Sequence, residues 1–294
     1  MNDKRSLLML ASSMVIFGTI GVFRRYIPLS SGILACARGF IGALCLLGFL
    51  AVRRQPFRRE GLERTWLLLV LSGALIGFNW IFLFEASNYT TVATATLCYS
   101  MAPVIVVLCS PLLCHERLPP RRLLCVALAL LGMVFVSGVN GLPSAGEARG
   151  IACGLAAAVL YASVVMMNKK IAGVGTCERT ILQLLSAAVV LLPYLAATED
   201  FSAVRFTPLA AGMLLIVGVV HTGAAYALYF GSVEGLRAQT LALLSYIDPV
   251  TAILLSALIL HERMTPLGVL GAALVLGSTV AGELWTGKSE PSGT

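Results

Sequence analysis

The sequence predicts an all-α integral membrane protein with ten transmembrane helices in two five-helix inverted repeats. Of its 294 residues, 58% are hydrophobic and 12% are charged, and the mean hydropathy is +0.90. A soluble globular domain usually carries about a quarter charged residues. The charges also cluster, which leaves uncharged runs of roughly 20 residues, the length that crosses a bilayer as a helix. In addition, residues 94–128 recur in recognisable form as residues 240–274.

Charged or polar turns separate the expected helices. The apolar runs between these turns are continuous and lack the two-residue alternation of transmembrane β-strands, so the sequence favours helices over a β-barrel. The expected spans are residues 7–23, 31–51, 66–86, 91–113, 122–139, 150–170, 178–197, 208–230, 237–260 and 266–285.

The charges in the turns predict how the chain crosses the membrane. Lys4 and Arg5 precede an apolar run that could pass for a secretory signal, but no small-residue cleavage site follows, so we expect a retained helix. With a cytoplasmic N-terminus, about three times as many Lys and Arg residues fall inside as outside. Both termini are therefore expected in the cytoplasm, and the short loops suit a cell inner membrane. The net charge of +7 is then explained by basic loops that face anionic lipid headgroups, so no nucleic-acid partner is expected.

The repeat is clearest in the tripeptide His-Glu-Arg at 115–117, which returns at 261–263; Pro120 and Pro266 follow the two copies. The copies are five spans apart, an odd number, so the two halves enter the membrane from opposite sides. We interpret the tripeptide as a polar helix end that orders the turn into a proline-started helix. The expected parts are a first repeat over residues 1–145, a second, inverted repeat over residues 146–286, and a short cytoplasmic tail over residues 287–294.

Two prolines occupy matching positions inside the fourth and ninth expected spans, Pro103 and Pro249. A proline inside a helix removes a backbone hydrogen bond and tends to kink the helix. Paired kinks in corresponding helices point to a central binding site. Proline is also commoner in membrane helices than in soluble ones, so a purely structural role stays open.

Further features recur between the halves. Phe17-Gly18 in the first span is answered by Tyr161-Ala162 in the sixth, and a glutamate with a basic neighbour precedes the last span of each half. In these features, the paired prolines and the short loops, nearly the whole chain resembles the drug/metabolite transporter superfamily, and within it the EamA-type transporters. The resemblance implies a ten-helix inverted-repeat carrier with a cavity between its halves. Such carriers move amino acids, metabolites, amines or related solutes, often outward.

Four ionisable residues lie inside expected spans, where a charge costs at least a few kcal/mol, so each is a candidate site residue. They are Arg38, Glu85, His221 and Asp248. Glu85 is interpreted as reaching the outer interface, with a gate or a contact to a substrate amine as the alternative. His221 could relay protons, with a hydrogen-bonded packing role as the alternative.

Asp248 is the first choice for binding a cation or a proton. It precedes Pro249, where the kink should free backbone groups and open the helix towards a cavity. A buried ion pair with Arg38 is the structural alternative. The repeat sets these acids apart, because Asp248 aligns with Ala102 and Glu85 aligns with glycine in the other half.

Aromatic residues show the opposite pattern, because several recur in both halves. Phe17 pairs with Tyr161 and Trp80 with Tyr226, and such rings could form a cavity wall that holds an apolar or cationic group, although packing or lipid contact is the commoner role. The candidate substrate-binding residues are Asp248, Trp80, Asn79, Tyr226, Tyr99, Tyr246, Tyr161, Phe17 and Arg38.

The sequence favours a secondary transporter of small organic solutes such as amino acids, metabolites or amines. We expect an exporter that works by alternating access. Its transport is either coupled to protons through Asp248, Glu85 or His221 or proceeds by facilitated diffusion. An efflux carrier for organic cations such as quaternary amines is the alternative. Arg38 slightly favours a zwitterion, because it could pair a carboxylate.

Other classes of protein are disfavoured by missing motifs. The chain has no G-x-x-x-x-G-K-[ST] sequence for ATP and no H-E-x-x-H sequence for a metal, so we expect neither an enzyme nor a cofactor or metal site. Its eight cysteines include no C-x-x-C pair and are interpreted as reduced packing residues. The expected partners are the solute, the lipid bilayer and protons, in a monomer or dimer.

Overall fold

The computed structural model describes residues 3–54, 56–57, 61–114, 120–136, 144–201, 204, 207–233, 236 and 238–286. All regular secondary structure in these ranges is helical, which confirms the predicted all-α class. Seven helices there are long and apolar enough to cross a membrane, and shorter apolar helices accompany them over Leu123–Val136, Ile247–Leu258 and Pro266–Gly282.

The helices of the first half of the chain are α1 (Asp3–Arg25), α2 (Ser31–Val52), α3 (Leu62–Tyr89), α4 (Val92–Tyr99), α5 (Ala102–Cys114) and α6 (Pro120–Val136). Those of the second half are α7 (Ala145–Asn168), α8 (Thr176–Thr198), α9 (Pro208–Gly218), the π-helix η1 (Val219–Ala224), α10 (Ala225–Val233), α11 (Ala238–Ser245), α12 (Ile247–Leu258) and α13 (Pro266–Thr286).

Local sequence explains where several helices begin. Ser30, Thr91 and Thr207 precede α2, α4 and α9, and each side chain accepts a hydrogen bond from a backbone N–H of the first turn. Pro120 and Pro266 are the first residues of α6 and α13, a position where the missing N–H has no cost. The proline-started helices expected after both copies of the tripeptide are therefore present.

Two of the expected spans are broken into shorter helices at matching positions. Ser100 and Met101 separate α4 from α5, and Tyr246 separates α11 from α12. Pro103 and Pro249 lie in the first turn of the helix after each break. A proline is tolerated there because it removes a hydrogen bond that the start of a helix does not make. The two breaks therefore lie at corresponding positions of the repeated sequence.

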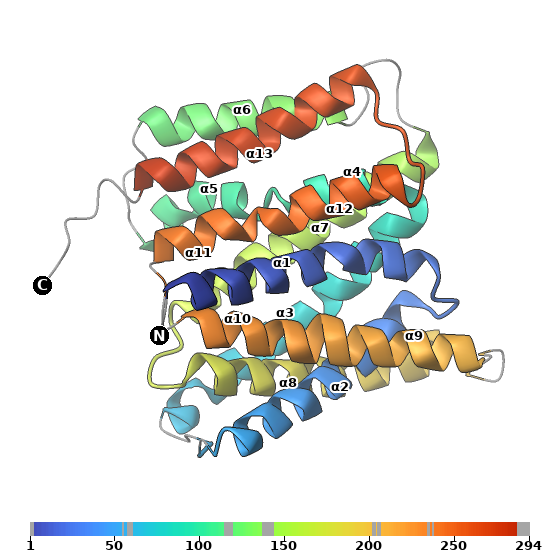
Figure 1. Cartoon of the computed structure of the whole chain (residues 1–294), viewed down its shortest axis with the longest axis vertical. Helices are drawn as coiled ribbons and strands as arrows, with labels where there is room; N and C mark the ends of the chain where they lie inside the picture. The colour runs from blue at the N-terminus through green and yellow to red at the C-terminus, as the bar shows by residue number, and fades with distance from the viewer. Residues whose placement is uncertain are drawn as a thin grey trace, which may run out of the picture.

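Helices from the two halves of the chain interleave (Figure 1). Helix α1 packs between α12 and α10, while α7 packs against α3, α4 and α5. Helix α2 packs on α8 and η1, and α6 and α13 form a pair at one side of the molecule (Figure 1). Helices α1 and α12 lie close together at Gly18, where an added Cβ would lie 2.6 Å from the carbonyl oxygen of Asp248. The start of α12 therefore lies directly against α1.

The outside of the described bundle is apolar. Large side chains such as Leu8, Leu192 and Leu258 are 69%, 57% and 70% exposed. Exposed apolar surface on this scale is unusual for a soluble monomer and is what a hydrocarbon environment accommodates.

Candidate functional site

Arg38 is a buried cation on α2. Its Nε donates a hydrogen bond to the hydroxyl of Thr222 at 2.8 Å. The guanidinium carbon lies 4.2 Å from the ring centroid of Trp80 and 6.0 Å from that of Phe84. Only 5% of Arg38 is exposed, so the hydroxyl and the aromatic faces replace the water that such a charge requires. Residues on α2, α3 and η1 thus hold one positive charge in place.

Asp248 is the acid that faces this cation. It is the second residue of α12 and follows the break at Tyr246, and its side chain is partly exposed. It lies within electrostatic range of Arg38, Tyr99 and Tyr226. No direct ion pair joins Asp248 to Arg38, both of which lie in the described part of the chain. The charges therefore attract one another across a gap.

Tyrosine rings from three helices surround the two charges. The ring of Tyr99, the last residue of α4, lies 5.4 Å from that of Tyr161 on α7. Tyr226 on α10 lies 5.2 Å from Phe17 on α1 and 5.9 Å from Phe230, between centroids. Tyr161 is 41% exposed although it lies within electrostatic range of Tyr226 and Asp248. Tyr161 therefore lies near these groups and keeps accessible surface.

We call these residues the central cluster, and they come from helices α2, α3, α4, α7, α10 and α12. The members are Arg38, Trp80, Tyr99, Tyr161, Tyr226 and Asp248. All six were predicted from the sequence as candidate substrate-binding residues, and Phe17 contacts the cluster through Tyr226. The arrangement offers a cation, an anion, phenolic hydroxyls and flat apolar faces within one site.

His221 lies beside the cluster, in the π-helix. Its Nε2 shares a hydrogen bond of 2.8 Å with the hydroxyl of Thr19, and its ring packs on Phe23 with centroids 4.7 Å apart. His221 is 1% exposed, and its Nδ1 lies 3.4 Å from the carbonyl oxygen of Ile216. The ring thus has partners on both nitrogens, as a packing histidine would.

The remaining candidates are bonded to the scaffold or lie at a break between helices. Asn79 is 1% exposed and donates to the carbonyl oxygen of Ala157 at 2.6 Å, which fastens α3 to α7. Glu85 accepts hydrogen bonds from Ser31 at 2.6 Å and Asn88 at 3.3 Å near the end of α3. Tyr246 occupies the break between α11 and α12.

Several residues that position the site were not predicted from the sequence. Thr222 fixes Arg38, and Thr19 fixes His221. The π-helix turns the adjacent His221 and Thr222 towards two different helices, α1 and α2. The available signal was the position of Thr222 next to His221 in an apolar span, because a hydroxyl there needs a partner.

The described residues contain no group of three or more His, Cys, Asp or Glu that could hold a metal ion. Seven cysteines in these ranges are free thiols. The first copy of the His-Glu-Arg tripeptide, at 115–117, lies outside the described residues.

Comparison with known proteins shows what the chain resembles in sequence. The EamA-like transporter family matches residues 4–138 and again residues 148–281. The uncharacterized transporter YxxF of Bacillus subtilis is 30% identical over 268 residues, covering 90% of this chain and 84% of that protein. Protein RarD of Salmonella typhi is 29% identical over 218 residues, covering 72% and 71%. Protein PecM of Dickeya dadantii is 25% identical over 219 residues, covering 73% and 72%.

A solved crystal structure shares the fold. It aligns with a TM-score of 0.68 and covers 96% of this chain and 98% of its own, at 21% sequence identity. This likeness establishes the architecture, whereas chemistry must be argued from the site.

Proposed function

Because the chain belongs to the EamA-like transporter family, we propose that it is a secondary carrier that moves small organic solutes across the cell membrane by alternating access. In this proposal the chain forms ten membrane spans in two inverted five-helix repeats, over residues 1–145 and 146–286. The matching breaks in the α4–α5 and α11–α12 segments are what such repeats would produce. Both termini lie in the cytoplasm in this topology.

The observation that carries the proposal is the gap between Arg38 and Asp248. Two opposite charges inside a membrane protein would normally form a direct pair, because an unpaired charge is costly there. Here each is held by its own helix, and the tyrosines around them keep accessible surface. A solute that carries both charges satisfies the two residues at once, which makes its binding favourable.

The chemistry of the central cluster favours a zwitterionic solute such as an amino acid. Its ammonium group binds Asp248, its carboxylate binds the guanidinium of Arg38, and its side chain lies against Tyr99 and Tyr161. An organic cation is the second candidate, because the rings of Phe17, Tyr226 and Phe230 lie together and could bind a quaternary amine by cation–π contact.

Export is the direction we propose, driven by the solute gradient or by protons. Asp248 is the leading residue for proton coupling, because a carboxylate that exchanges a solute ammonium for a proton links the two fluxes. Glu85 and His221 are the other candidates, although each is bonded to the scaffold. Solute flux into proteoliposomes under pH gradients of either direction tests the coupling, and a flux that ignores the gradient contradicts it.

A thermal-shift screen of the purified protein tests the substrate class. A bound solute raises the melting temperature of the state that it binds. Amino acids, amines and nucleotide sugars are compared on the wild type, on Asp248→Asn and on Glu63→Gln, which changes an exposed acid at the start of α3. We expect an amino acid or amine to stabilise the wild type and the Glu63 variant, but not the Asp248 variant. Equal stabilisation of all three contradicts the proposed site.

A further inference from the structure

Glu262 lies in the turn after α12, and its carboxylate bonds to three other parts of the chain. Its Oε1 accepts a hydrogen bond from the guanidinium of Arg25 at 2.8 Å, within an ion pair. Its Oε2 accepts from the backbone N–H of Val92 at 2.8 Å and from the hydroxyl of Ser256. Arg25 also donates to the carbonyl oxygen of Thr90 at 2.8 Å. One side chain therefore ties together the end of α1, the start of α4 and α12.

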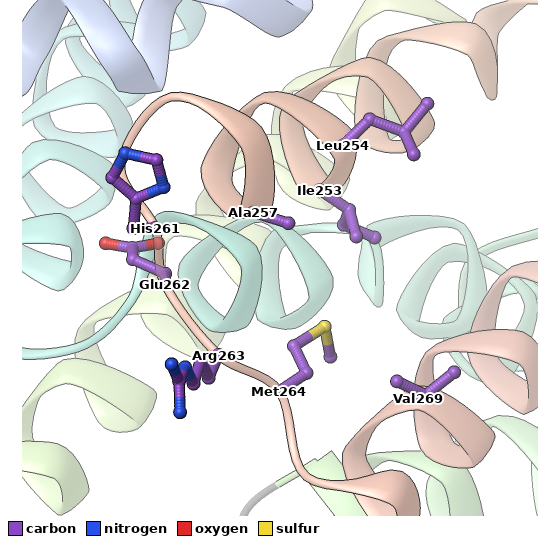
Figure 2. Close-up of a pocket in the computed structure, with 8 residues that line it drawn as sticks. All are labelled: Ile253, Leu254, Ala257, His261, Glu262, Arg263, Met264 and Val269. Atoms are coloured by element: carbon purple, nitrogen blue, oxygen red, sulfur yellow. The ribbon is translucent and has the colours of Figure 1, made fainter.

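The surroundings aim the carboxylate of Glu262 into the protein. His261 adopts a left-handed backbone conformation with φ of 54°, which turns the chain sharply after α12. Glu262, Leu254 and Val269 are among the residues that line a groove of about 610 Å³ between α12 and α13, and Figure 2 shows the Glu262 carboxylate turned away from Leu254 and Val269. The Glu262 side chain is 12% exposed and that of Arg25 is 33% exposed. The ion pair is thus partly shielded from water.

Glu262 also supplies an anion that the start of α4 lacks. The side chain of Thr91 accepts from the N–H of Thr94, so the N–H of Val92 needs another partner. A helix start carries partial positive charge and is stabilised by a nearby carboxylate. The partner of Val92 comes from a segment 170 residues further along the chain. This contact joins the two halves of the molecule.

Two short helices connect Glu262 to the central cluster. Helix α4 runs from Val92, bonded to Glu262, to Tyr99, a distance of about 10 Å at 1.5 Å per residue. Helix α12 runs from Asp248 to Ser256, which also bonds to Glu262, over about 12 Å. If a bound solute changes the distance between Tyr99 and Asp248, helices α4 and α12 move with these residues. This movement displaces Val92 and Ser256, two of the partners of Glu262.

We propose that Glu262, with Arg25 and the start of α4, is a latch that closes one end of the solute pathway and must open in each transport cycle. This inference rests on the proposed function. In the proposed topology the latch lies at the outer end, and the structure holds it closed. Glu262 is a positioning residue, because it acts on the site through α4 and α12 and touches no solute.

Reversible cross-linking tests the latch. Arg25→Cys and Glu262→Cys are combined in a chain whose native cysteines are replaced, and a bifunctional methanethiosulfonate spans the pair. We expect solute flux in proteoliposomes to fall at least tenfold on cross-linking and to recover with reductant. The matched control pairs Glu63→Cys with Leu67→Cys, two exposed positions one turn apart on α3, because this cross-link joins no separate segments. Unchanged flux with the cross-link in place overturns the latch, whereas a wild-type protein that moves no solute overturns the proposed function.

Hydrogen exchange gives a readout that does not depend on transport. Glu262→Gln removes the negative charge while it keeps a side-chain carbonyl, so the residues 90–99 should exchange their amide hydrogens several times faster than in the wild type. Arg263→Gln should leave the same peptide unchanged. Equal exchange in both variants and the wild type contradicts the proposal that the carboxylate holds α4.

Discussion

The α4–α5 and α11–α12 segments have the same backbone break but different chemistry. In the first segment, α4 ends at Tyr99, whose ring packs on Tyr161, and Ala102 is buried at 3% exposure. In the second, Asp248 is the second residue of α12 and faces Arg38 across a gap. The two segments thus share a backbone break, whereas the carboxylate of Asp248 has a buried alanine, Ala102, at the corresponding position of the first segment.

The largest effect is expected from Asp248→Asn, which removes the carboxylate that distinguishes the second segment from the first. An amide in Asp248→Asn has the same size but cannot neutralise an ammonium group. We expect solute flux in proteoliposomes to fall at least about 30-fold, since loss of one partner of a buried charge pair costs about 2 kcal/mol or more. Glu63→Gln serves as the control for protein amount and melting temperature. Flux at the wild-type rate in the Asp248 variant would remove this residue from the site.

Introducing the corresponding acid into the first half of the chain should destabilise the fold instead. Ala102→Asp introduces a carboxylate at a buried position that has no cation prepared for it, which costs about 2 kcal/mol or more. We expect a clear fall in melting temperature in detergent. Asp248→Ala should melt at or above the wild-type temperature, because a functional charge is held at some cost in stability. The proposed difference between the two segments is contradicted if Ala102→Asp and Asp248→Ala shift the melting temperature in the same direction by similar amounts.

A smaller effect on transport is expected from substitution of Trp80, whose ring contacts the guanidinium of Arg38. The guanidinium of Arg38 lies 4.2 Å from this ring, and a cation–π contact contributes about 0.5–2 kcal/mol. Trp80→Leu should raise the KM for a zwitterionic solute by about 3- to 10-fold, with a smaller change in Trp80→Phe, which keeps an aromatic face. A larger loss in the Phe variant than in the Leu variant would contradict the contact.

The fold was predictable because membrane helices leave a strong sequence signal. The span expected over residues 31–51 is α2 at Ser31–Val52, and the helix starts at Pro120 and Pro266 follow from ordinary proline chemistry. The π-helix η1 was not predicted, since one wide turn in an apolar run leaves no mark in composition. The breaks were expected only as kinks, because hydropathy does not report where backbone hydrogen bonds are missing.

The central cluster was predictable in membership but not in geometry. A charge or a ring in an apolar span is easy to recognise, and the repeat aligned Trp80 with Tyr226. The support of Arg38 by Thr222 and the anchoring of Asn79 to α7 depend on contacts between helices distant in sequence. The bonding of Glu262 to Val92 was not predicted for the same reason, and it joins the second copy of the tripeptide, at 261–263, to the first half of the chain.

The central claim is that Arg38 and Asp248 bind opposite groups of one solute. Its most direct test is the binding of three matched ligands, an amino acid, the amine left by its decarboxylation and the acid left by its deamination, to the wild type, Arg38→Gln and Asp248→Asn. We predict that Arg38→Gln loses the acid but keeps the amine, and that Asp248→Asn loses the amine but keeps the acid. Variants that lose both ligands equally, or keep both, would contradict the account.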